Sequence, residues 1–405
     1  SSFDGDRILV STGAYVDNVT IPHRNISILP MTSNDEYTIQ GNIIFSTSSF
    51  SSSVKKLTIS SADIIGDFIS LGSVNSLHEI NLIDCKVFGR IDLVEDNILA
   101  NLYFSEFYHS IILANSSEIV GNRMYGSSNP LYDDTLSIYN PSFINPNFQT
   151  GLKIYANRIN NFKIICYKNN NKLHVSNNYI SSEKTSTSAG YSLIKLDGNQ
   201  ANCIFENNTT RKNMYTYLSL WGTHLEVSSG ILSIKIRNNL FLRNDGNNNM
   251  SNTAAFLDFN GGQSTITYLN NNFFNWEFLN GGNQQTITLF SHNYNSPTTF
   301  FEADNIEDYS FNQPSSITPS NLNDSTGIPL TNLLTVTENL GLDIIDCRDI
   351  DDTQNDIGTW GGPHSWANYH TPSIGKGKII DLNLISTFGN SSNSLLNIRS
   401  KAVVK

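Results

Sequence analysis

A repeating unit in the middle of the chain limits the folds that this sequence can adopt. Each unit has two short strands of alternating polar and apolar residues, and the second strand ends in Asn-Asn or a close substitute. Such units recur every ~20 to 35 residues, a period typical of solenoids, and helical patterns are nearly absent. The sequence therefore predicts an all-β solenoid. The first strands are 162–169, 192–199, 218–222, 254–262 and 277–282, and the second strands are 172–180, 203–209, 232–241, 266–274 and 287–294.

The Asn-Asn pairs predict how strands meet at a corner of the coil. A corner needs a residue that tolerates positive φ, and Asn is the best candidate after Gly. Stacked Asn side chains can also hydrogen-bond along a column, as in the Asn ladders of cross-β structures. In the N-terminal third, apolar runs at ~15 to 22 residues predict one strand per coil. We expect two Asn columns in the middle of the chain, Asn177, Asn207, Asn238 and Asn270 in one and Asn178, Asn208, Asn239 and Asn271 in the other.

Composition excludes several classes of function. The chain has a formal net charge of −11 and gathers Lys and Arg on no short stretch, which argues against nucleic acid or an anionic membrane surface as partner. No apolar run approaches the ~18 residues that a membrane-spanning helix needs. The four cysteines lie far apart and the eight histidines are isolated, so no zinc site is predicted. We expect buried thiols, and histidines on the surface or in ladders.

Two segments resemble one family. Residues 5–21 (GDRILVSTGAYVDNVTI) resemble the G-D-x-I-x-V-x-x-G-x-Y first coil of bacterial right-handed parallel β-helix proteins of the pectate-lyase-like superfamily. Residues 349–363 (DIDDTQNDIGTWGGP) resemble the D-x-D-x-T-x-x-D-I-G-x-x-G-G-P segment that often follows the last coil in secreted members. The resemblance implies a right-handed parallel β-helix that is extracellular or on the bacterial outer surface. It implies little about activity, because this fold hosts lyases, hydrolases, adhesins and phage spikes.

The resemblance also suggests how the chain is divided. In the family a helical cap normally precedes the first coil, whereas only four residues precede Gly5 here, so we expect a part of a longer chain. We predict a parallel β-helix over 1–340 and a C-terminal cap segment with the GGP motif over 341–370. The start of a small β-rich appendage should follow over 371–405.

One outward face of the coils has the composition of a sugar-binding surface. An exposed Trp flanked by Asp, Asn and Lys suits a carbohydrate, because the ring stacks on apolar sugar faces and the polar groups bind hydroxyls. An ordinary solvated face with one stray aromatic residue is the alternative. Aligning the first strands on their closing Gly gives one column of Lys195, Ser219, Asp258 and Phe278 and another of Asp197, Trp221, Asn260 and Asn280. The predicted ligand-binding residues are Trp221, Asp197, Asp258, Asn260 and Lys195.

Catalysis on the same face is the alternative function. A lyase would need a base for the proton α to a uronate carboxylate, and Lys195 beside Asp197 is a weak candidate. A glycosidase needs carboxylates about 5 to 9.5 Å apart. Strand geometry puts Asp197 and Asp258 roughly 10 to 12 Å apart, which disfavours that pair. Loop carboxylates such as Glu302 and Asp304 leave a hydrolase possible.

Four oxygen-bearing residues near the C-terminus have the alternating spacing of a loop that binds a hard cation. Asp349, Asp351, Thr353 and Asp356 supply such oxygens, and Ca²⁺ accepts six to eight of them in irregular geometry. The spacing lacks the Gly and distal Glu of an EF-hand. We expect a structural Ca²⁺ here; the alternative is that the Asp residues only cap turns before Ile357.

The sequence thus favours a module that recognises carbohydrate or another surface partner without catalysis. A polysaccharide lyase or glycoside hydrolase acting on the same face is the first alternative, and a structural component of a surface assembly is the second. The expected partner is a polysaccharide or a surface protein, and the only expected cofactor is structural Ca²⁺.

Overall fold

The computed structural model describes the solenoid as far as Asp308 and three parts of the C-terminal region. Beyond Leu242 side chains are described only within 349–365. The described residues are 4–32, 35–45, 51–70, 76–95, 97–114, 116, 118–128, 134–139, 151–167, 173–182, 192–197, 203–214, 224–228, 233–245, 255–260, 266–270, 273–278, 288–291, 299–303, 306–308, 349, 354–356, 358–365, 377–390 and 393–404.

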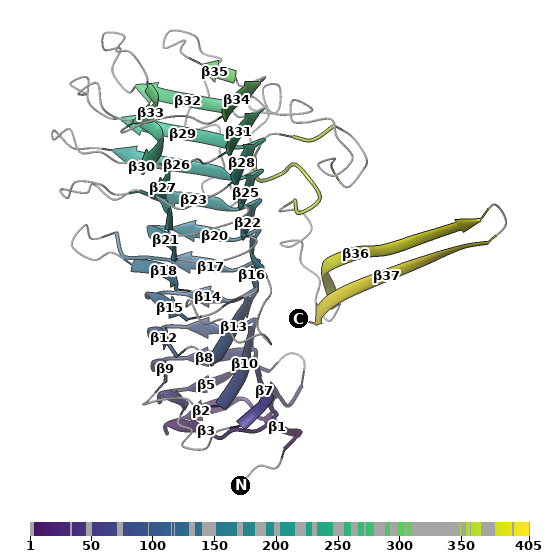
Figure 1. Cartoon of the computed structure of the whole chain (residues 1–405). Coiled ribbons are helices and arrows are strands. Elements are labelled where there is room, and N and C mark those ends of the chain that lie inside the picture. The colour runs from purple at the N-terminus through teal and green to yellow at the C-terminus, as the bar shows by residue number, and fades with distance from the viewer. Residues whose placement is uncertain are drawn as a thin grey trace.

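The chain is a right-handed parallel β-helix in which three strands form each coil (Figure 1). Each strand pairs in parallel with the equivalent strands of the coils before and after it, so every third strand belongs to the same sheet. The described residues contain no helix, and hence none that is long and apolar enough to cross a membrane. The prediction of a parallel β-helix from the repeats and the resemblance is therefore confirmed.

Sheet A contains β1 (Asp6–Val10), β4 (Ile26–Pro30), β7 (Ser51–Ser60), β10 (Ser76–Ile83), β13 (Ile98–Tyr103), β16 (Glu118–Val120), β19 (Leu152–Tyr155), β22 (Leu173–Ser176), β25 (Cys203–Glu206), β28 (Ser233–Arg237), β31 (Ile266–Asn270) and β34 (Thr299–Ala303). Sheet B contains β2 (Gly13–Tyr15), β5 (Tyr37–Ile39), β8 (Ala62–Ile64), β11 (Lys86–Val87), β14 (Glu106–Phe107), β17 (Arg123–Tyr125), β20 (Arg158–Asn160), β23 (Tyr179–Ser182), β26 (Thr209–Met214), β29 (Leu240–Asp245), β32 (Phe273–Phe278) and β35 (Ile306–Asp308). Sheet C contains β3 (Val19–Ile21), β6 (Ile43–Phe45), β9 (Phe68–Ser70), β12 (Ile91–Leu93), β15 (Ile111–Leu113), β18 (Asp134–Ile138), β21 (Phe162–Tyr167), β24 (Ile194–Asp197), β27 (Leu225–Ser228), β30 (Ala255–Asn260) and β33 (Thr288–Ser291).

The hydrophobic core runs along the solenoid axis. Alternate residues of each strand point inward, so Ile80 and Leu82 of β10 are buried at 0% and 1% exposure. Inward residues also pack on one another from coil to coil, as the rings of Phe45 and Phe68 do, tilted by 43° with centroids 5.4 Å apart. One coil alone cannot bury its apolar side, so the stability of each coil depends on its neighbours.

The N-terminal third has the same three-strand coil as the rest of the chain. The structure adds two strands per coil to the one that the sequence predicted there, and most of the added strands have only two or three residues, too few to show a period. Gly41, Gly66 and Gly89 form a column at the corner between sheets B and C. A Cβ on any of them would lie 2.2 to 2.4 Å from a carbonyl oxygen of the preceding coil, so only glycine fits.

A ladder of five buried Asn side chains joins coils at the corner between sheets A and B. The Nδ2 atoms of Asn122, Asn157, Asn178 and Asn208 each donate to Oδ1 of the next Asn, the last being Asn239, at 2.9, 2.9, 2.9 and 3.1 Å. All five side chains are 0% exposed. The predicted ladder is confirmed in this column, and it begins two coils earlier than the sequence indicated.

The other predicted Asn column has a different role. Asn177, Asn207 and Asn238 each directly precede a ladder position and have the positive φ of the corner. The side chains of Asn177 and Asn207 contact the C-terminal segment (residues 354–365) rather than one another. Asn270 is wrongly placed in the prediction, because it pairs with Arg237, one position before the corner. Asn271 lies outside the described residues. The residues with positive φ at this corner are Ser61, Asp84, Phe104, Gly121, Ala156, Asn177, Asn207 and Asn238.

Three predicted strands of the later coils need correction. The segment 218–222 lies outside the described residues, and β27 (Leu225–Ser228) pairs between β24 and β30 in its place. The start of 277–282 belongs to β32 in sheet B. The segment 287–294 contains β33, which pairs with β30 in sheet C and is therefore a first strand rather than a second. Closing Gly residues misled the alignment because the loops that contain them vary in length.

Three of the four cysteines are buried free thiols, as expected: Cys85, Cys166 and Cys203. Burial raises the pKa of Cys85 and of Cys203 to about 12, so these groups are protonated and unreactive at neutral pH. Cys347 lies outside the described residues.

The C-terminal region ends in an antiparallel hairpin of β36 (Gly377–Asn390) and β37 (Asn393–Val404). It is drawn in yellow in Figure 1, where it stands apart from the three sheets. This hairpin falls within the range 371–405, for which a β-rich appendage is predicted.

The ladder makes a testable prediction about stability. Asn178→Ala removes a carboxamide that donates to Asn208 and accepts from Asn157, and it leaves buried polar groups without partners. We expect a loss of about 2 to 4 kcal/mol in the free energy of unfolding, measured by urea denaturation. Asn160→Ala is the control, because its half-buried side chain accepts a bond from Ser181 at the sheet surface. Equal losses in the two variants would contradict a special role for the ladder.

Candidate functional site

Sheet C brings together several residues of the predicted sugar-binding face. Lys195 in β24 pairs with Glu226 in β27, and Glu226 pairs with Asp258 in β30. Neighbouring strands lie about 4.8 Å apart, so these positions form one outward column over three coils. Glu226 occupies the position that the sequence alignment gave to Ser219. Phe278 is wrongly placed in this column, because it belongs to β32 of sheet B.

The second outward column of sheet C runs beside the first. Tyr167 pairs with Asp197. Ser228 continues this column in the next coil, and it pairs with Asn260 in the coil after that. The ring of Tyr167 stacks on the ring of Tyr139, with centroids 4.8 Å apart and planes 10° from parallel. Trp221 lies outside the described residues, and Asp258 and Asn260 are placed by their backbone alone.

An ion pair fixes the centre of this face. Lys195 Nζ donates to Glu226 Oε1 at 2.8 Å, and the Ser192 hydroxyl donates to Glu226 Oε2. The hydrogen bond to Glu226 raises the pKa of Lys195 despite partial burial, and the nearby charge of Asp197 adds to the effect. Burial opposes ionisation of Glu226, but the bonds from Lys195 and Ser192 outweigh it and lower its pKa. Both partners are therefore charged at neutral pH.

This charge state bears on the alternative functions. A protonated Lys195 has no lone pair with which to accept a proton, so it is poorly suited to act as the base of a lyase. An ionised Glu226 likewise cannot donate a proton to a leaving group. The arrangement instead offers fixed, partly exposed charges, which suit the recognition of a polar ligand.

The C-terminal segment lies along the side of the solenoid, beside the corner between sheets A and B (Figure 1). Asn177 Nδ2 donates to the carbonyl oxygen of Thr359 at 3.0 Å, and Asn207 Nδ2 donates to that of Asp356 at 2.9 Å. The Thr359 hydroxyl donates to Thr209 Oγ1 at 2.6 Å. The motif segment thus docks across several coils through the Asn column that contains Asn177 and Asn207.

Glycines allow this close approach. Gly358 and Gly362 have φ values of 96° and 75°, which favour glycine. A Cβ on Gly358 would lie 2.8 Å from Thr209 Oγ1, and one on Gly361 would lie 1.8 Å from the Asp356 carbonyl oxygen. The glycines of the motif are therefore required for its own turn and for contact with the coils.

The predicted cation loop is described only in part. Asp349 accepts hydrogen bonds from the backbone N–H groups of Asp356 and Gly362, so its carboxylate holds the loop closed. This bonding corresponds to the turn-capping role that was the alternative to Ca²⁺. Asp351 and Thr353 lie outside the described residues. Within the described residues, no group of three or more His, Cys, Asp or Glu side chains is arranged to hold a metal ion.

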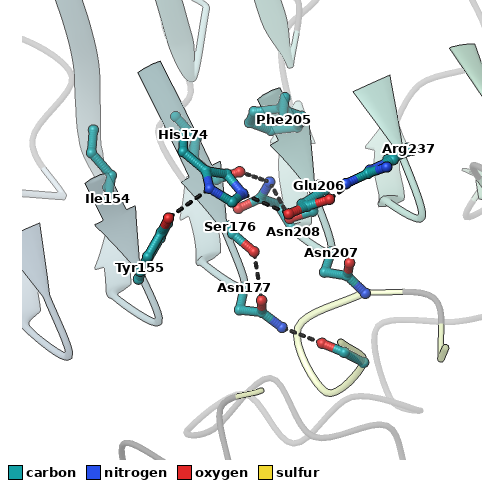
Figure 2. Close-up of polar contacts among 12 residues, drawn as sticks. Ile154, Tyr155, His174, Ser176, Asn177, Phe205, Glu206, Asn207, Asn208 and Arg237 are labelled. Carbon is teal, nitrogen blue, oxygen red and sulfur yellow. Dashed lines mark hydrogen bonds and ion pairs between the residues drawn. The ribbon is translucent and has the colours of Figure 1, made fainter. Parts of the chain in front are cut away.

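A second polar cluster, which the sequence did not predict, lies on the outward face of sheet A (Figure 2). The Tyr155 hydroxyl contacts His174 Nδ1 at 2.6 Å, and His174 Nε2 contacts Glu206 Oε1 at 2.5 Å. Arg237 Nε donates to Glu206 Oε2 at 2.6 Å. His364 of the C-terminal segment stacks on Tyr155, with ring centroids 4.2 Å apart. His174 is therefore part of a network and not an isolated histidine.

The sequence contains a signal for this cluster. Glu206 and Arg237 directly precede the Asn-Asn pairs of their strands, and the two residues pair in register. Alignment of the strands on the ladder Asn, rather than on closing Gly, places these opposite charges side by side. His364 has no such signal, because its contact depends on how the C-terminal segment folds back.

The sheet A cluster is a closed network rather than an open site. Burial opposes ionisation of Glu206, but hydrogen bonds from His174 and Arg237 lower its pKa to about 2. Tyr155 is 3% exposed and Glu206 4%. Because each polar atom named here already has a partner, the cluster stabilises neighbouring coils and the docked segment.

No known family matches this chain. Comparison with models of protein families, with curated protein sequences and with solved structures finds no match in any of the three. Function therefore has to be argued from the two clusters themselves.

Replacing Glu206 tests the electrostatic role of the sheet A cluster. Glu206→Gln should destabilise the protein at pH 7 by up to about 3 kcal/mol, because a carboxylate with a lowered pKa stabilises the fold when ionised. The stabilisation is complete above the ordinary pKa of 4.5 and is lost as pH falls through about 2, so the wild-type and variant unfolding curves should converge there.

The control is Glu106→Gln, which breaks a more exposed ion pair with Arg123. Exposed pairs contribute about 0 to 1 kcal/mol, so this variant should differ little from wild type. A Glu206→Gln variant that is as stable as wild type at pH 7 contradicts the assignment.

Proposed function

We propose that the chain is an extracellular or cell-surface module that binds carbohydrate through the outward face of sheet C and does not catalyse a reaction on it. The observation that carries the proposal is the hydrogen-bonded group of Lys195, Glu226 and Ser192. Lys195 and Glu226 lie on adjacent strands and remain partly open to solvent, with side-chain exposures of 28% and 12%, and the buried Ser192 hydroxyl holds Glu226 in place. Preorganised polar groups of this kind suit a ligand with many hydroxyls.

Two further features support the proposal. The stacked rings of Tyr139 and Tyr167 adjoin the polar group and supply apolar surface. The resemblance of residues 5–21 and 349–363 to secreted β-helix proteins supports a location outside the cell or on its surface. Trp221, from the segment just before β27, remains a proposed contact.

One observation favours a hydrolase as the second candidate. Glu226 and Asp258 pair on adjacent strands, about 4.8 Å apart at the backbone, which is compatible with the carboxylate separation of a retaining glycosidase. The ionised state of Glu226 argues against it as the acid. The experiments below separate binding from hydrolysis.

The binding proposal predicts retention of the protein by polysaccharides. Wild type should be slowed in affinity electrophoresis through gels that contain a neutral polysaccharide, from a panel of β-glucan, xylan and mannan. Glu226→Gln and Lys195→Ala should each weaken retention about tenfold, because either change breaks the ion pair that orients the polar groups. Trp221→Ala should weaken it without changing the melting temperature.

A matched control is Glu106→Gln on sheet B, which alters an ion pair away from the site. Retention by no polysaccharide in the panel contradicts the proposal. Release of reducing ends that is lost in Glu226→Gln and in Asp258→Asn would identify a hydrolase. Unsaturated products from polygalacturonate, lost in Lys195→Ala, would identify a lyase.

We also propose a structural Ca²⁺ in the loop that contains Asp349, Asp351, Thr353 and Asp356. EGTA should then lower the melting temperature by several degrees, and Ca²⁺ should restore it. Asp349→Asn should destabilise the loop in either case, because Asp349 accepts backbone hydrogen bonds. Asp351→Asn distinguishes the two roles, since it should abolish the EGTA effect only if a cation is bound. An EGTA scan identical to the untreated one contradicts the proposal.

A further inference from the structure

Sheet B forms one side of the solenoid (Figure 1), and its outward face carries two columns of side chains. The first column is apolar at its centre, where Phe88 stacks on Tyr108 at 4.8 Å and Tyr108 on Tyr125 at 5.4 Å. Ile65 precedes Phe88 in the column, and these two residues are 49% and 37% exposed. In successive coils from β5 to β20 the column reads Gln40, Ile65, Phe88, Tyr108, Tyr125 and Asn160.

The second column carries alternating charges. Lys86 Nζ lies 3.7 Å from the carboxylate of Asp63 and 3.3 Å from that of Glu36, and Arg123 Nη1 lies 3.2 Å from Glu106 Oε1. Each of these side chains is at least 24% exposed, so the charges pair along the column without being buried. From β5 to β20 the column reads Thr38, Asp63, Lys86, Glu106, Arg123 and Arg158.

The exposure of this face is a property of the described chain. The corners on both sides of β8, β11 and β14 consist of described residues. The C-terminal segment contacts later coils, through Asn177 and Asn207. The centre of sheet B is therefore an exposed apolar patch with a charged rim, which is typical of a protein interaction surface.

The order of the charges makes the face complementary to itself. From β8 to β17 the signs alternate as minus, plus, minus and plus, so the same column read backward has the opposite sign at every position. A two-fold rotation about an axis parallel to the strands reverses the order of the coils but keeps each column opposite its own copy. With the axis between β11 and β14, Asp63 faces Arg123 of a second copy, and Lys86 faces Glu106.

The apolar column is matched by the same rotation. Phe88 faces Tyr108 of the second copy, and Ile65 faces Tyr125, so apolar surface meets apolar surface. The amides of Gln40 and Asn160 face each other at both ends. A two-fold axis parallel to the solenoid would instead place the charged column on the aromatic one and desolvate charges against rings.

We propose that sheet B is a homodimer interface, in which two copies of the chain pack face to face with antiparallel solenoid axes. Each charge of the column keeps its neighbour in its own chain and gains an opposite charge from the second copy, so association leaves no buried charge unpaired. The interface is isologous, since the same patch serves both copies. Sheet C is a different side of the solenoid, so the inference is independent of the proposed carbohydrate site.

The size of the face determines how tightly the copies associate. Six coils from β5 to β20 span about 24 Å along the axis, and the patch is two columns wide. Such a patch is at the small end of specific interfaces, so we expect reversible dimers with a dissociation constant of about 10 μM. Well below that concentration the chain is a monomer, and glycan retention can be measured apart from association.

The test is sedimentation equilibrium of the full chain from about 1 to 200 μM. Lys86→Glu should raise the dissociation constant at least tenfold, because two pairs of carboxylates then face each other across the axis. Glu106→Lys should do the same through two pairs of cations. Lys56→Glu is the matched control, since it reverses an exposed charge that pairs with Glu79 on sheet A.

A mixture of two variants tests the geometry. Lys86→Glu and Glu106→Lys each place like charges opposite themselves, but in a mixed dimer every one of these positions faces an opposite charge. An equimolar mixture should therefore form heterodimers at concentrations where each variant alone is a monomer. Thermal melting of each variant confirms that it is folded.

Each result decides the inference. Wild-type dimers that are lost in both variants and restored in the mixture support it. Wild type that stays monomeric at 200 μM overturns it, as do dimers that persist in folded Lys86→Glu, which would place the interface elsewhere. A mixture that stays monomeric overturns the antiparallel arrangement, and an equal loss in Lys56→Glu would show a general effect of charge. Loss of glycan retention by wild type at 1 μM would contradict the proposed function and leave this inference standing.

Discussion

The Asn ladder is the interaction on which the rest of this structure depends. A carboxamide buried away from water needs hydrogen-bond partners for its donors and its acceptor, because otherwise the free energy of desolvating them destabilises the fold. Here each ladder Asn finds them in the adjoining coils: Asn178, for example, accepts from Asn157 and donates to Asn208. A coil shifted by one residue would bury these groups without partners. The ladder therefore fixes the register of the coils as well as their contact.

Register at the corner sets the chemistry of the outer faces. Once the coils are aligned, Lys195 lies opposite Glu226 on sheet C, and Glu206 lies opposite Arg237 on sheet A. The same repeat thus produces two charge networks, which differ in exposure. The sheet A network is covered and contacts the C-terminal segment, whereas the sheet C network stays partly open. Burial, rather than residue type, separates the structural cluster from the candidate binding site.

The sequence predicted the features that depend on local backbone chemistry. Alternating strands and Asn-Asn pairs were sufficient for the all-β solenoid and for the ladder from Asn178 to Asn239, because strand alternation and buried carboxamides impose specific residue types. It failed where loop length intervenes: the closing Gly residues placed Ser219 where Glu226 lies. The contact of His364 with Tyr155 was beyond prediction, since it joins segments about 200 residues apart in the chain.

Asn177 and Asn207, the first residues of their Asn-Asn pairs, are Asn because of docking rather than because of the corner itself. At the equivalent positions of earlier coils, Ser61, Phe104 and Ala156 hold the same positive φ, so the corner does not require Asn. Asn appears at this position where the C-terminal segment lies, and Asn177 and Asn207 donate to the backbone of that segment. Bonds to backbone carbonyls recognise the path of the chain, and Asn207 adds one bond to the Asn355 side chain. The paired Asn of the repeat therefore reflects two constraints at neighbouring positions: the second residue holds the coils in register, and the first binds the segment that returns along them.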